Sequence, residues 1–180
     1  MKILGISGSL RQGSNNSRLL SAAASLMPET VVFEIADCLD RLPHFNPDLE
    51  VGDLPVVSDL VDQVRKSDGL IISTPEYARG YPGALKNSLD WLVQTDAHID
   101  KPFMMLNASA RSTVGQGTLI TVLETMSGIH VESASVTIPL LGKNLDEQQI
   151  RDNAEWADQI RHALDTFIRE IGGRAQPLEN

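Results

Sequence analysis

The sequence of 180 residues contains a single cysteine, Cys38, and only 4% aromatic residues. One cysteine cannot form an internal disulfide, and such sparing use is typical of a reducing compartment. No stretch approaches the ~20 apolar residues that a membrane-spanning helix requires. The first apolar run is too short for a signal peptide, and no small-residue cleavage site follows it. We therefore expect a cytoplasmic protein that does not enter a membrane.

Positive charge is also scarce, since 15 Lys and Arg stand against 24 Asp and Glu, giving a formal net charge of −9. This balance argues against nonspecific binding to nucleic acids or acidic membranes, which attract basic surfaces. The length suits one domain, which we predict over residues 1–172. The remaining residues, 173–180, include glycine and proline and are predicted to form a flexible tail.

Several kinds of catalytic arrangement are missing. Cys38 and His44 have no partners at metal-ligand spacing, so we expect both to be structural or surface residues and predict no metal site. No Ser-His-Asp or Cys-His constellation is present. The segment Ser7-Gly8-Ser9 does not fit the G-x-S-x-G nucleophile elbow. The sequence thus offers no side-chain nucleophile.

What the sequence does contain is a loop rich in Gly, Ser and Asn between a short apolar run, 2–6, and a helical pattern over 16–27. A helix N-terminus has unpaired N–H groups and a partial positive charge, which favour a phosphate. The loop lacks the lysine of a Walker loop and the G-x-G-x-x-G of a dinucleotide fingerprint. An ordinary strand-to-helix connection with an N-cap is the alternative. Donors are the hydroxyls of Ser7, Ser9, Ser14 and Ser17, the amides of Asn15 and Asn16, and the guanidinium of Arg11.

A second distinctive loop follows the apolar run 69–74, which predicts a strand buried on both faces. Its sequence, PEYARGYPG, is rich in proline and glycine, and a helix follows from Ala84. Its backbone N–H groups can bond the edge of a heterocycle, and Tyr77 can pack against the rim. A third loop of small residues, 108–117, follows a strand predicted over 101–107.

The remaining patterns predict strands over 30–35 and 131–138, and helices over 54–66, 118–126 and 146–171. Five strands that alternate with helices predict an α/β three-layer sandwich with a parallel sheet and helices on both faces. The favoured strand order is the flavodoxin-like 2-1-3-4-5, which makes the first and third strands neighbours. The two informative loops should therefore meet. A receiver domain shares this topology but requires an acidic cluster where this chain has Ser7-Gly8-Ser9.

Both loops resemble those of the NADPH-dependent FMN reductases, a flavodoxin-like family that includes azo, quinone and chromate reductases. In the first loop the matching residues are Gly8, Ser9, Leu10, Arg11, Gly13, Ser14 and Asn16. In the second they are Pro75, Glu76, Tyr77, Pro82, Gly83, Leu85, Lys86, Asn87, Asp90 and Trp91. The chain departs from the family at Ala78 and Gly80, where Asn and Ser are usual.

The resemblance implies that FMN is the cofactor. Its phosphate would be held by Ser9, Arg11, Ser14, Asn16 and Ser17. Its ring would lie between the segment Pro75, Glu76, Tyr77, Ala78 and Gly80 and the third loop, where Ser109, Ala110 and Arg111 are the candidates. NADPH, or NADH, would pass hydride to the flavin, which would reduce a quinone, azo compound, free flavin or metal oxyanion. A homodimer or homotetramer is implied as well.

Alternatives remain open at this point. The protein could be a noncatalytic, regulatory flavin- or nucleotide-binding protein, or a flavodoxin-type electron carrier. Glu76 could donate a proton, or bind a backbone amide or solvent. Arg111 could contact the flavin, the 2′-phosphate of NADPH or an acidic surface group. Trp91 is expected in the core or at a subunit interface.

Overall fold

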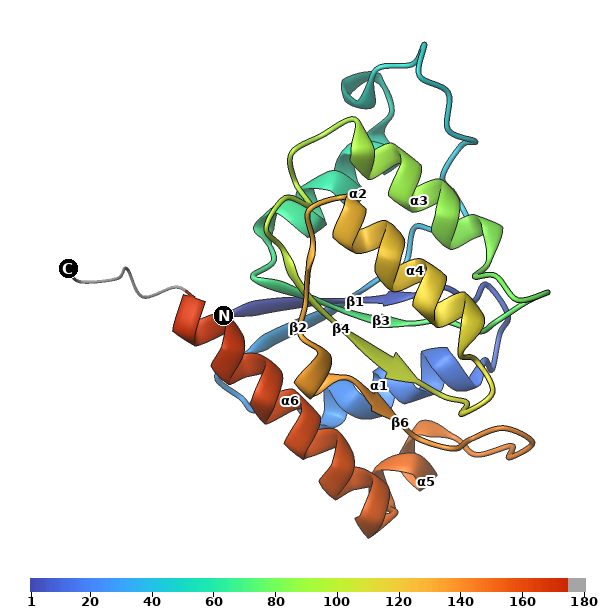
Figure 1. Cartoon of the computed structure of the whole chain (residues 1–180), viewed down its shortest axis with the longest axis vertical. Coiled ribbons are helices and arrows are strands. Elements are labelled where there is room, and N and C mark those ends of the chain that lie inside the picture. Colours follow the sequence, from blue (N-terminus) through green and yellow to red (C-terminus); the bar gives the residue numbers. More distant parts are fainter. Residues whose placement is uncertain (175–180) are drawn as a thin grey trace.

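The computed structural model describes residues 1–174 and contains one parallel sheet (Figure 1). The strands run in the order β2-β1-β3-β4-β5. The short strand β6 pairs with the last residues of β4, further along that strand than β5. This confirms the predicted order 2-1-3-4-5. The strands are β1 (Lys2–Ser7), β2 (Val32–Ala36), β3 (Gly69–Ser73), β4 (Pro102–Asn107), β5 (Ile129–His130) and β6 (Val136–Thr137).

Helices cover both faces of the sheet. The helices are α1 (Asn15–Leu26), α2 (Pro55–Lys66), α3 (Gly83–Val93), α4 (Val114–Thr125), α5 (Glu147–Asp152) and α6 (Ala154–Arg174), with 3-10 turns at Val51–Asp53 and Glu132–Ala134. Helices α1 and α6 lie on one face, and α2, α3 and α4 lie on the other (Figure 1). The central strands β3 and β4 are buried at every position, as their uninterrupted apolar sequences predict.

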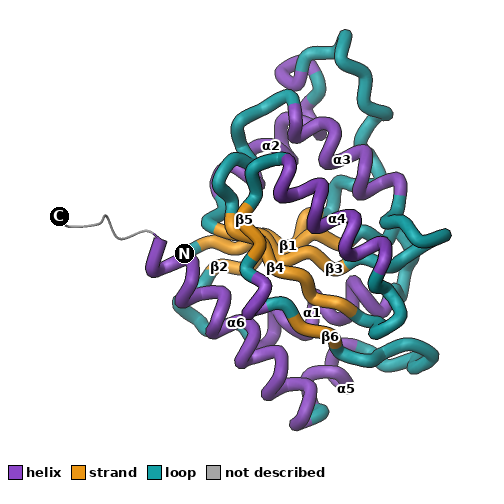
Figure 2. Tube along the Cα trace, viewed as in Figure 1, coloured by secondary structure: helices purple, strands orange, loops and turns teal. Residues whose placement is uncertain are grey.

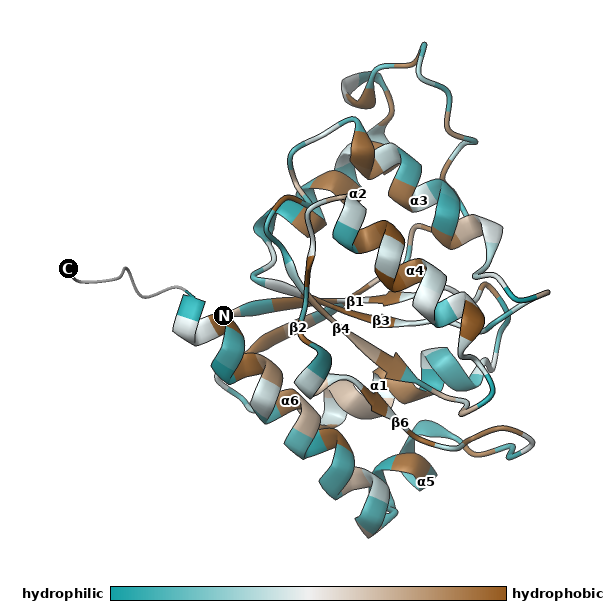
Figure 3. Cartoon of the chain, viewed as in Figure 1, coloured by the Kyte–Doolittle hydropathy of each residue, from teal (hydrophilic) through white to brown (hydrophobic). Residues whose placement is uncertain are grey.

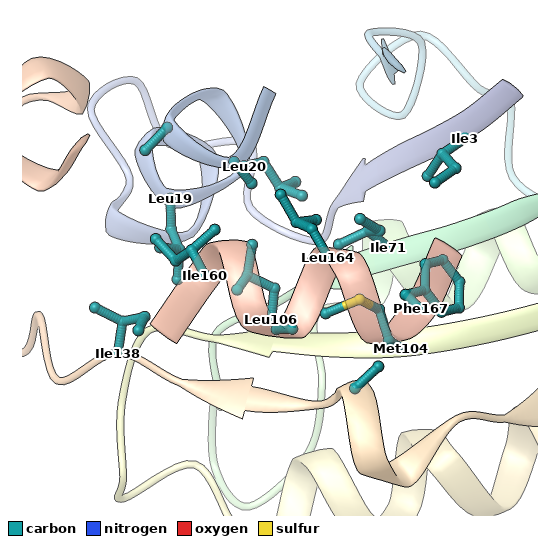
Figure 4. Packing of buried hydrophobic residues seen from close by; sticks show 14 of the residues in the cluster. Ile3, Leu19, Leu20, Ile71, Met104, Leu106, Ile138, Ile160, Leu164 and Phe167 are labelled. Atoms are coloured by element: carbon teal, nitrogen blue, oxygen red, sulfur yellow. The ribbon is translucent and has the colours of Figure 1, made fainter. Parts of the chain in front are cut away.

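The core therefore has two halves, one on each side of the sheet. On the first face, Ile160, Leu164 and Phe167 of α6 pack with α1 and with residues of β1, β3 and β4 (Figure 4). These α6 residues recur at i+3 and i+4, which places them on one stripe of the helix. Figure 3 shows the strands in brown and alternating brown and teal bands along α6.

The strand predicted over 131–138 is wrong, because only Val136–Thr137 (β6) of this range forms a strand, and β5 ends before it at His130. Between β5 and β6 the chain forms the 3-10 turn Glu132–Ala134. The Ser135 hydroxyl accepts a hydrogen bond of 3.0 Å from the Met105 N–H, a donor of β4 that a continuous strand would have paired. A side chain thus replaces a ladder hydrogen bond and lets the backbone turn away.

The helix predicted over 146–171 is also wrong in detail, since it is divided into α5 and α6. Asn153 lies between them in an extended conformation, and its side-chain oxygen accepts from the Trp156 N–H at 3.0 Å. Asparagine therefore starts a new helix by capping its first turn. Helix α6 continues through Gly173 and Arg174, whereas the rest of the predicted tail, 175–180, lies outside the described residues.

The lone cysteine is a core residue. Cys38 is fully buried, and burial, with a smaller contribution from Asp59, raises the pKa of its thiol. His44 is exposed. Among residues 1–174, no helix has the length and apolarity needed to cross a membrane.

Candidate functional site

A cavity of about 760 Å³ opens where the loops after β1, β3, β4 and β6 come together. In Figure 2 these loops lie at the right-hand end of the strands. The volume falls within the range of about 300–1,000 Å³ that is usual for ligand pockets. The cavity is lined by Ser9, Arg11, Gly13, Ser14, Asn15, Asn16, Pro75, Glu76, Tyr77, Ala108, Ser109, Arg111, Ser112, Leu141, Gly142, Lys143 and Asn144.

The loop after β1 is held in place by its own polar residues. Ser14 is the N-cap of α1, and its hydroxyl accepts from the Asn16 N–H at 3.3 Å. The amide oxygen of Asn16 accepts from the Ser73 hydroxyl at 3.1 Å, which ties the loop to the end of β3. The N-cap interpretation is thus correct for Ser14, and it presents the start of α1 to the cavity.

Gly8 explains how the first and second loops approach each other so closely. A Cβ atom at this position would collide with the side chain of Thr74, the residue that follows β3. The Gly8 N–H donates to the Ser73 carbonyl at 2.9 Å. Glycine is therefore required here for the two strand ends to join at the switch point.

The loop after β3 forms a tight hairpin. Tyr77 and Gly80 exchange two backbone hydrogen bonds of 2.8 and 2.9 Å. The two residues at its tip, Ala78 and Arg79, have φ angles of +50° and +64°. Two positive φ angles are typical of a type I′ turn, in which Asn and Gly are the favoured residues. The hairpin leaves the Tyr77 side chain 56% exposed beside the cavity.

Glu76 has a structural partner. Its carboxylate accepts a hydrogen bond of 2.8 Å from the Gly115 N–H in the first turn of α4. The Thr113 side chain makes no cap hydrogen bond, so Glu76 caps this helix from another loop. This contact bears out the backbone-amide alternative for Glu76.

Helix α4 begins at Val114, four residues before the predicted start, and this earlier start also depends on glycine. A Cβ on Gly115 would lie 2.9 Å from the carbonyl carbon and oxygen of Gly80. The helix end therefore packs directly against the hairpin. Gly115 and Gly117 therefore belong to the helix, although they lie within the loop predicted over 108–117.

The loop after β4 repeats the construction of the loop after β1. The Asn107 amide oxygen accepts from the Ser109 N–H at 3.0 Å, and the Ser109 hydroxyl accepts from the Arg111 N–H at 3.2 Å. In the first loop, Ser7 accepts from the Ser9 N–H and Ser9 accepts from the Arg11 N–H, both at 3.3 Å. Two similar turns thus place one arginine on each of these loops. Both Arg11 and Arg111 line the cavity.

The segment 141–144 is a wall of the cavity that sequence reasoning missed. The Asn15 amide donates to the Leu140 carbonyl at 2.8 Å, and Arg18 donates to Asn144 and to the Leu145 carbonyl at 3.1 and 2.8 Å. These bonds fasten the segment to α1. The signal was available, because this segment follows the last strand and so lies at the same edge of the sheet as the other loops.

Most of the predicted site residues meet at this cavity. Those that line it are Ser9, Arg11, Ser14, Asn16, Pro75, Glu76, Tyr77, Ser109 and Arg111. Ser17, Ala78 and Gly80 do not line it. The Ser17 hydroxyl lies 2.8 Å from that of Ser7, beside a smaller neighbouring cavity, and Gly80 closes the hairpin whose tip holds Ala78.

Asn87 and Trp91, later residues of the second motif, hold the segment between β2 and α2 in place. The Asn87 side chain accepts from the Phe45 N–H and donates to the Pro43 carbonyl, at 2.8 and 2.9 Å. Trp91 is fully buried, and its ring N–H also donates to Pro43, at 2.9 Å. These residues anchor the segment between β2 and α2, and the core interpretation of Trp91 is confirmed.

The cavity wall is polar and carries positive charge. It includes Arg11, Arg111 and Lys143 but one acidic side chain, Glu76. Among residues 1–174, no group of three or more His, Cys, Asp or Glu side chains could hold a metal ion. The donor set of hydroxyls, amides and guanidinium groups suits a phosphate on a flat heterocycle. Fold and site together define a flavodoxin-like protein with a nucleotide-type cavity at the switch point.

Comparison with known proteins identifies the family. The profile of the NADPH-dependent FMN reductase family matches residues 1–141, and the chain belongs to that family. An NAD(P)H-dependent FMN reductase from Pseudomonas aeruginosa is 41% identical over 113 residues, covering 61% of this chain and 60% of that protein. An NADPH azoreductase from a Bacillus species is 26% identical over 155 residues, covering 86% and 85%.

The fold is shared with a solved structure. FerB, a flavoenzyme NAD(P)H:(acceptor) oxidoreductase from Paracoccus denitrificans, superposes with a TM-score of 0.77 at 24% identity, covering 96% of this chain and 97% of FerB. This similarity concerns the fold. The matched segments span 60%, 49% and 47% of the lengths of three curated relatives.

Proposed function

We propose that this protein is an FMN-dependent NAD(P)H oxidoreductase. The observation that carries the proposal is the convergence of the loops after β1, β3 and β4 on one cavity at the switch point. Membership in the FMN reductase family supports it and favours it over a regulatory protein or an electron carrier.

The residues present fit FMN. The N-terminus of α1 and its cap Ser14 offer N–H and hydroxyl donors to a phosphate, and Arg11 offers a charged fork. Ser9 and Asn16 line the same region. The ring would lie between the Tyr77 hairpin and the Ser109 loop, where small residues leave the backbone accessible. FMN, when bound, accepts a hydride from NAD(P)H and passes it on, and the protein orients the reactants and excludes water.

The reaction requires no proton donor from Glu76, whose carboxylate is occupied at the start of α4. A quinone or an azo compound is the proposed acceptor class, since relatives are named 2-hydroxy-1,4-benzoquinone reductase and NADPH azoreductase. We also include free flavin and metal oxyanions among the proposed electron acceptors. We place the protein in the cytoplasm, because its one thiol is buried and unpaired.

A homodimer or homotetramer is also part of the proposal. The outer face of α4 presents Val114, Thr118, Thr121 and Thr125, all exposed. Each threonine hydroxyl donates to a carbonyl of its own helix, at 2.9, 3.0 and 2.7 Å. This leaves methyl groups on an uncharged face, which suits packing against a second copy.

Binding of FMN and of riboflavin to the apo protein tests the cofactor site, since riboflavin lacks the phosphate. We expect saturable FMN binding and weaker riboflavin binding. Arg11→Gln should weaken FMN binding by about tenfold or more, the value of a charge-assisted hydrogen bond, and leave riboflavin almost unaffected. Arg41→Gln, a surface change beside Asp37, is the matched control. Equal affinities for FMN and riboflavin would refute the phosphate site.

A further inference from the structure

The positive side chains of this acidic protein fall into three groups. Seven form ion pairs with Asp or Glu: Lys2, Arg41, Arg65, Lys66, Lys86, Arg151 and Arg161. Three others donate hydrogen bonds to oxygens of the chain: Arg18, Lys101 and Arg169. Within residues 1–173, the Lys and Arg side chains that show neither contact are Arg11, Arg79, Arg111 and Lys143.

Three of these four residues line one cavity, and the fourth lies on an adjoining hairpin. Arg11, Arg111 and Lys143 line it, and Arg79 stands at the tip of the hairpin whose Tyr77 lines it. They come from four loops, those after β1, β3, β4 and β6. The chain as a whole has a net charge of −9, so this group of positive side chains differs in sign from the rest of the protein.

The loops place the backbone of these residues at the cavity. The two serine turns hold the backbone N–H groups of Arg11 and Arg111 in similar ways on two loops. Lys143 lies in a turn closed by its own N–H and the Leu140 carbonyl at 3.0 Å, and its ammonium group is 4.8 Å from the centre of the Trp156 ring. Glu76 is the acidic side chain of the cavity wall, and its carboxylate accepts from the Gly115 N–H and forms no ion pair with these four side chains.

This excess exceeds what the proposed cofactor needs. A flavin phosphate is already served by Arg11 and by the N-terminus of α1, as argued above. Arg111 and Lys143 on the cavity wall, and Arg79 on the adjoining hairpin, remain to interact with a second ligand. Uncompensated charge of one sign at a cleft attracts ligands of the opposite sign and raises their association rates.

Resting on the proposed function, we infer that the site selects anionic electron acceptors: planar quinones or azo compounds that carry a sulfonate or carboxylate. NADPH and NADH are both polyanions, so the ring of positive charge serves either reductant. Electron acceptors, in contrast, are either neutral or anionic, and positive charge at the cavity favours the anionic ones. Leu141, 54% exposed on the cavity wall, and Tyr77 add apolar surface for a flat ring.

The test uses stopped flow to follow reoxidation of the reduced FMN-loaded protein. No nicotinamide donor is present, so its charge does not affect the measured rates. The protein is reduced with one equivalent of dithionite and mixed with a naphthoquinone sulfonate or with unsubstituted naphthoquinone. Each quinone takes a hydride from the reduced flavin and one proton from solvent, and becomes the hydroquinone. The readout is the ratio of second-order rate constants, sulfonate over neutral.

The test variant is Arg79→Gln with Lys143→Gln, and the control is Lys66→Gln with Arg161→Gln, which removes two charges from α2 and α6. We expect the ratio to fall about three- to tenfold in the test variant and to stay unchanged in the control. Added salt should lower the sulfonate rate of the unaltered protein more than the neutral rate. The ratio cancels any loss of activity that affects both quinones.

An unchanged ratio in the test variant, or an equal fall in the control, would overturn the inference while leaving the proposed function intact. Reoxidation by neither quinone would instead refute the proposed function, and the inference with it. The two failures are therefore distinct.

Discussion

The carboxylate of Glu76 and the backbone N–H of Gly115 are joined by a hydrogen bond of 2.8 Å between residues 39 positions apart. The bond connects the loop after β3 to the first turn of α4, and so closes one side of the cavity. A negative group at a helix N-terminus satisfies an unpaired donor and interacts favourably with the helix dipole.

Removal of this cap should destabilise the protein. Glu76→Ala should lower the free energy of unfolding by about 0.5–2 kcal/mol, the usual value of a lost N-cap. Glu76→Gln keeps an acceptor oxygen and should lose less. Urea unfolding of the two variants measures the difference. If Glu76→Gln costs as much as Glu76→Ala, the hydrogen bond is not what stabilises this contact.

The tip of the hairpin carries backbone strain at Ala78. An alanine with φ of +50° lies in the left-handed region, which costs roughly 1–2 kcal/mol for a residue with a Cβ. Asparagine tolerates this region, so Ala78→Asn should raise the free energy of unfolding by up to about 1 kcal/mol. Ala78→Val, with a branched side chain, should lower it. Thermal unfolding of both variants checks the signs, and a destabilising Ala78→Asn would contradict the assigned turn.

Asn87 should matter for stability and little for the cavity. Its side chain makes two partly buried hydrogen bonds, to Phe45 and Pro43. Asn87→Ala leaves the Phe45 N–H unsatisfied, whereas the Pro43 carbonyl keeps its hydrogen bond from Trp91, and the change should cost about 1–3 kcal/mol. Asn87→Asp keeps the acceptor for the Phe45 N–H and should cost less. Denaturant unfolding provides the values, and FMN affinity measured in parallel should remain near that of the unaltered protein.

Two histidines predict how stability depends on pH. Burial lowers the pKa of both His98 and His130, and the Nδ1 atom of His98 is buried without a hydrogen-bond partner in the described chain. Their pKa in the unfolded chain is about 6.5. As the pH falls, the unfolded chain therefore takes up protons at these histidines before the folded protein does. The stability that the two neutral histidines contribute is complete above about pH 6.5, and it is lost as the pH falls through their lowered pKa values in the folded state.

The measurement is the free energy of unfolding between about pH 7 and pH 5, a range above the ordinary pKa of Asp and Glu. His98→Gln should flatten the decline. His162→Gln, at an exposed position on α6, should leave the slope unchanged. A slope that His98→Gln does not reduce would show that this buried ring does not cause it.

The sequence predicted the strand order and the meeting of the first two loops, because long apolar runs such as β3 and the Gly-Ser loop before α1 are strong local signals. It failed where single side-chain contacts decide where an element begins or ends. The hydroxyl of Ser135 replaces a ladder bond of β4, Asn153 divides a periodic helix, and Glu76 starts α4 early. Each of these depends on a contact or a cap that periodicity does not encode.

The site was predictable to a similar extent. Residues on the loops after β1, β3 and β4 were recognised from their composition, and most of them line the cavity. The wall at 141–144 was missed because it is short and contains no distinctive motif. Ser17, Ala78 and Gly80 do not line this cavity, and their predicted contacts with FMN stay a prediction.

Anaerobic addition of NADPH to the FMN-loaded protein, followed by visible absorption, tests the central claim most directly. We predict that the oxidised flavin band bleaches without any partner protein, and that it returns when a quinone is added. Binding of FMN with no bleaching by NADPH or NADH would contradict the account, and would point to a carrier or a sensor in place of a reductase.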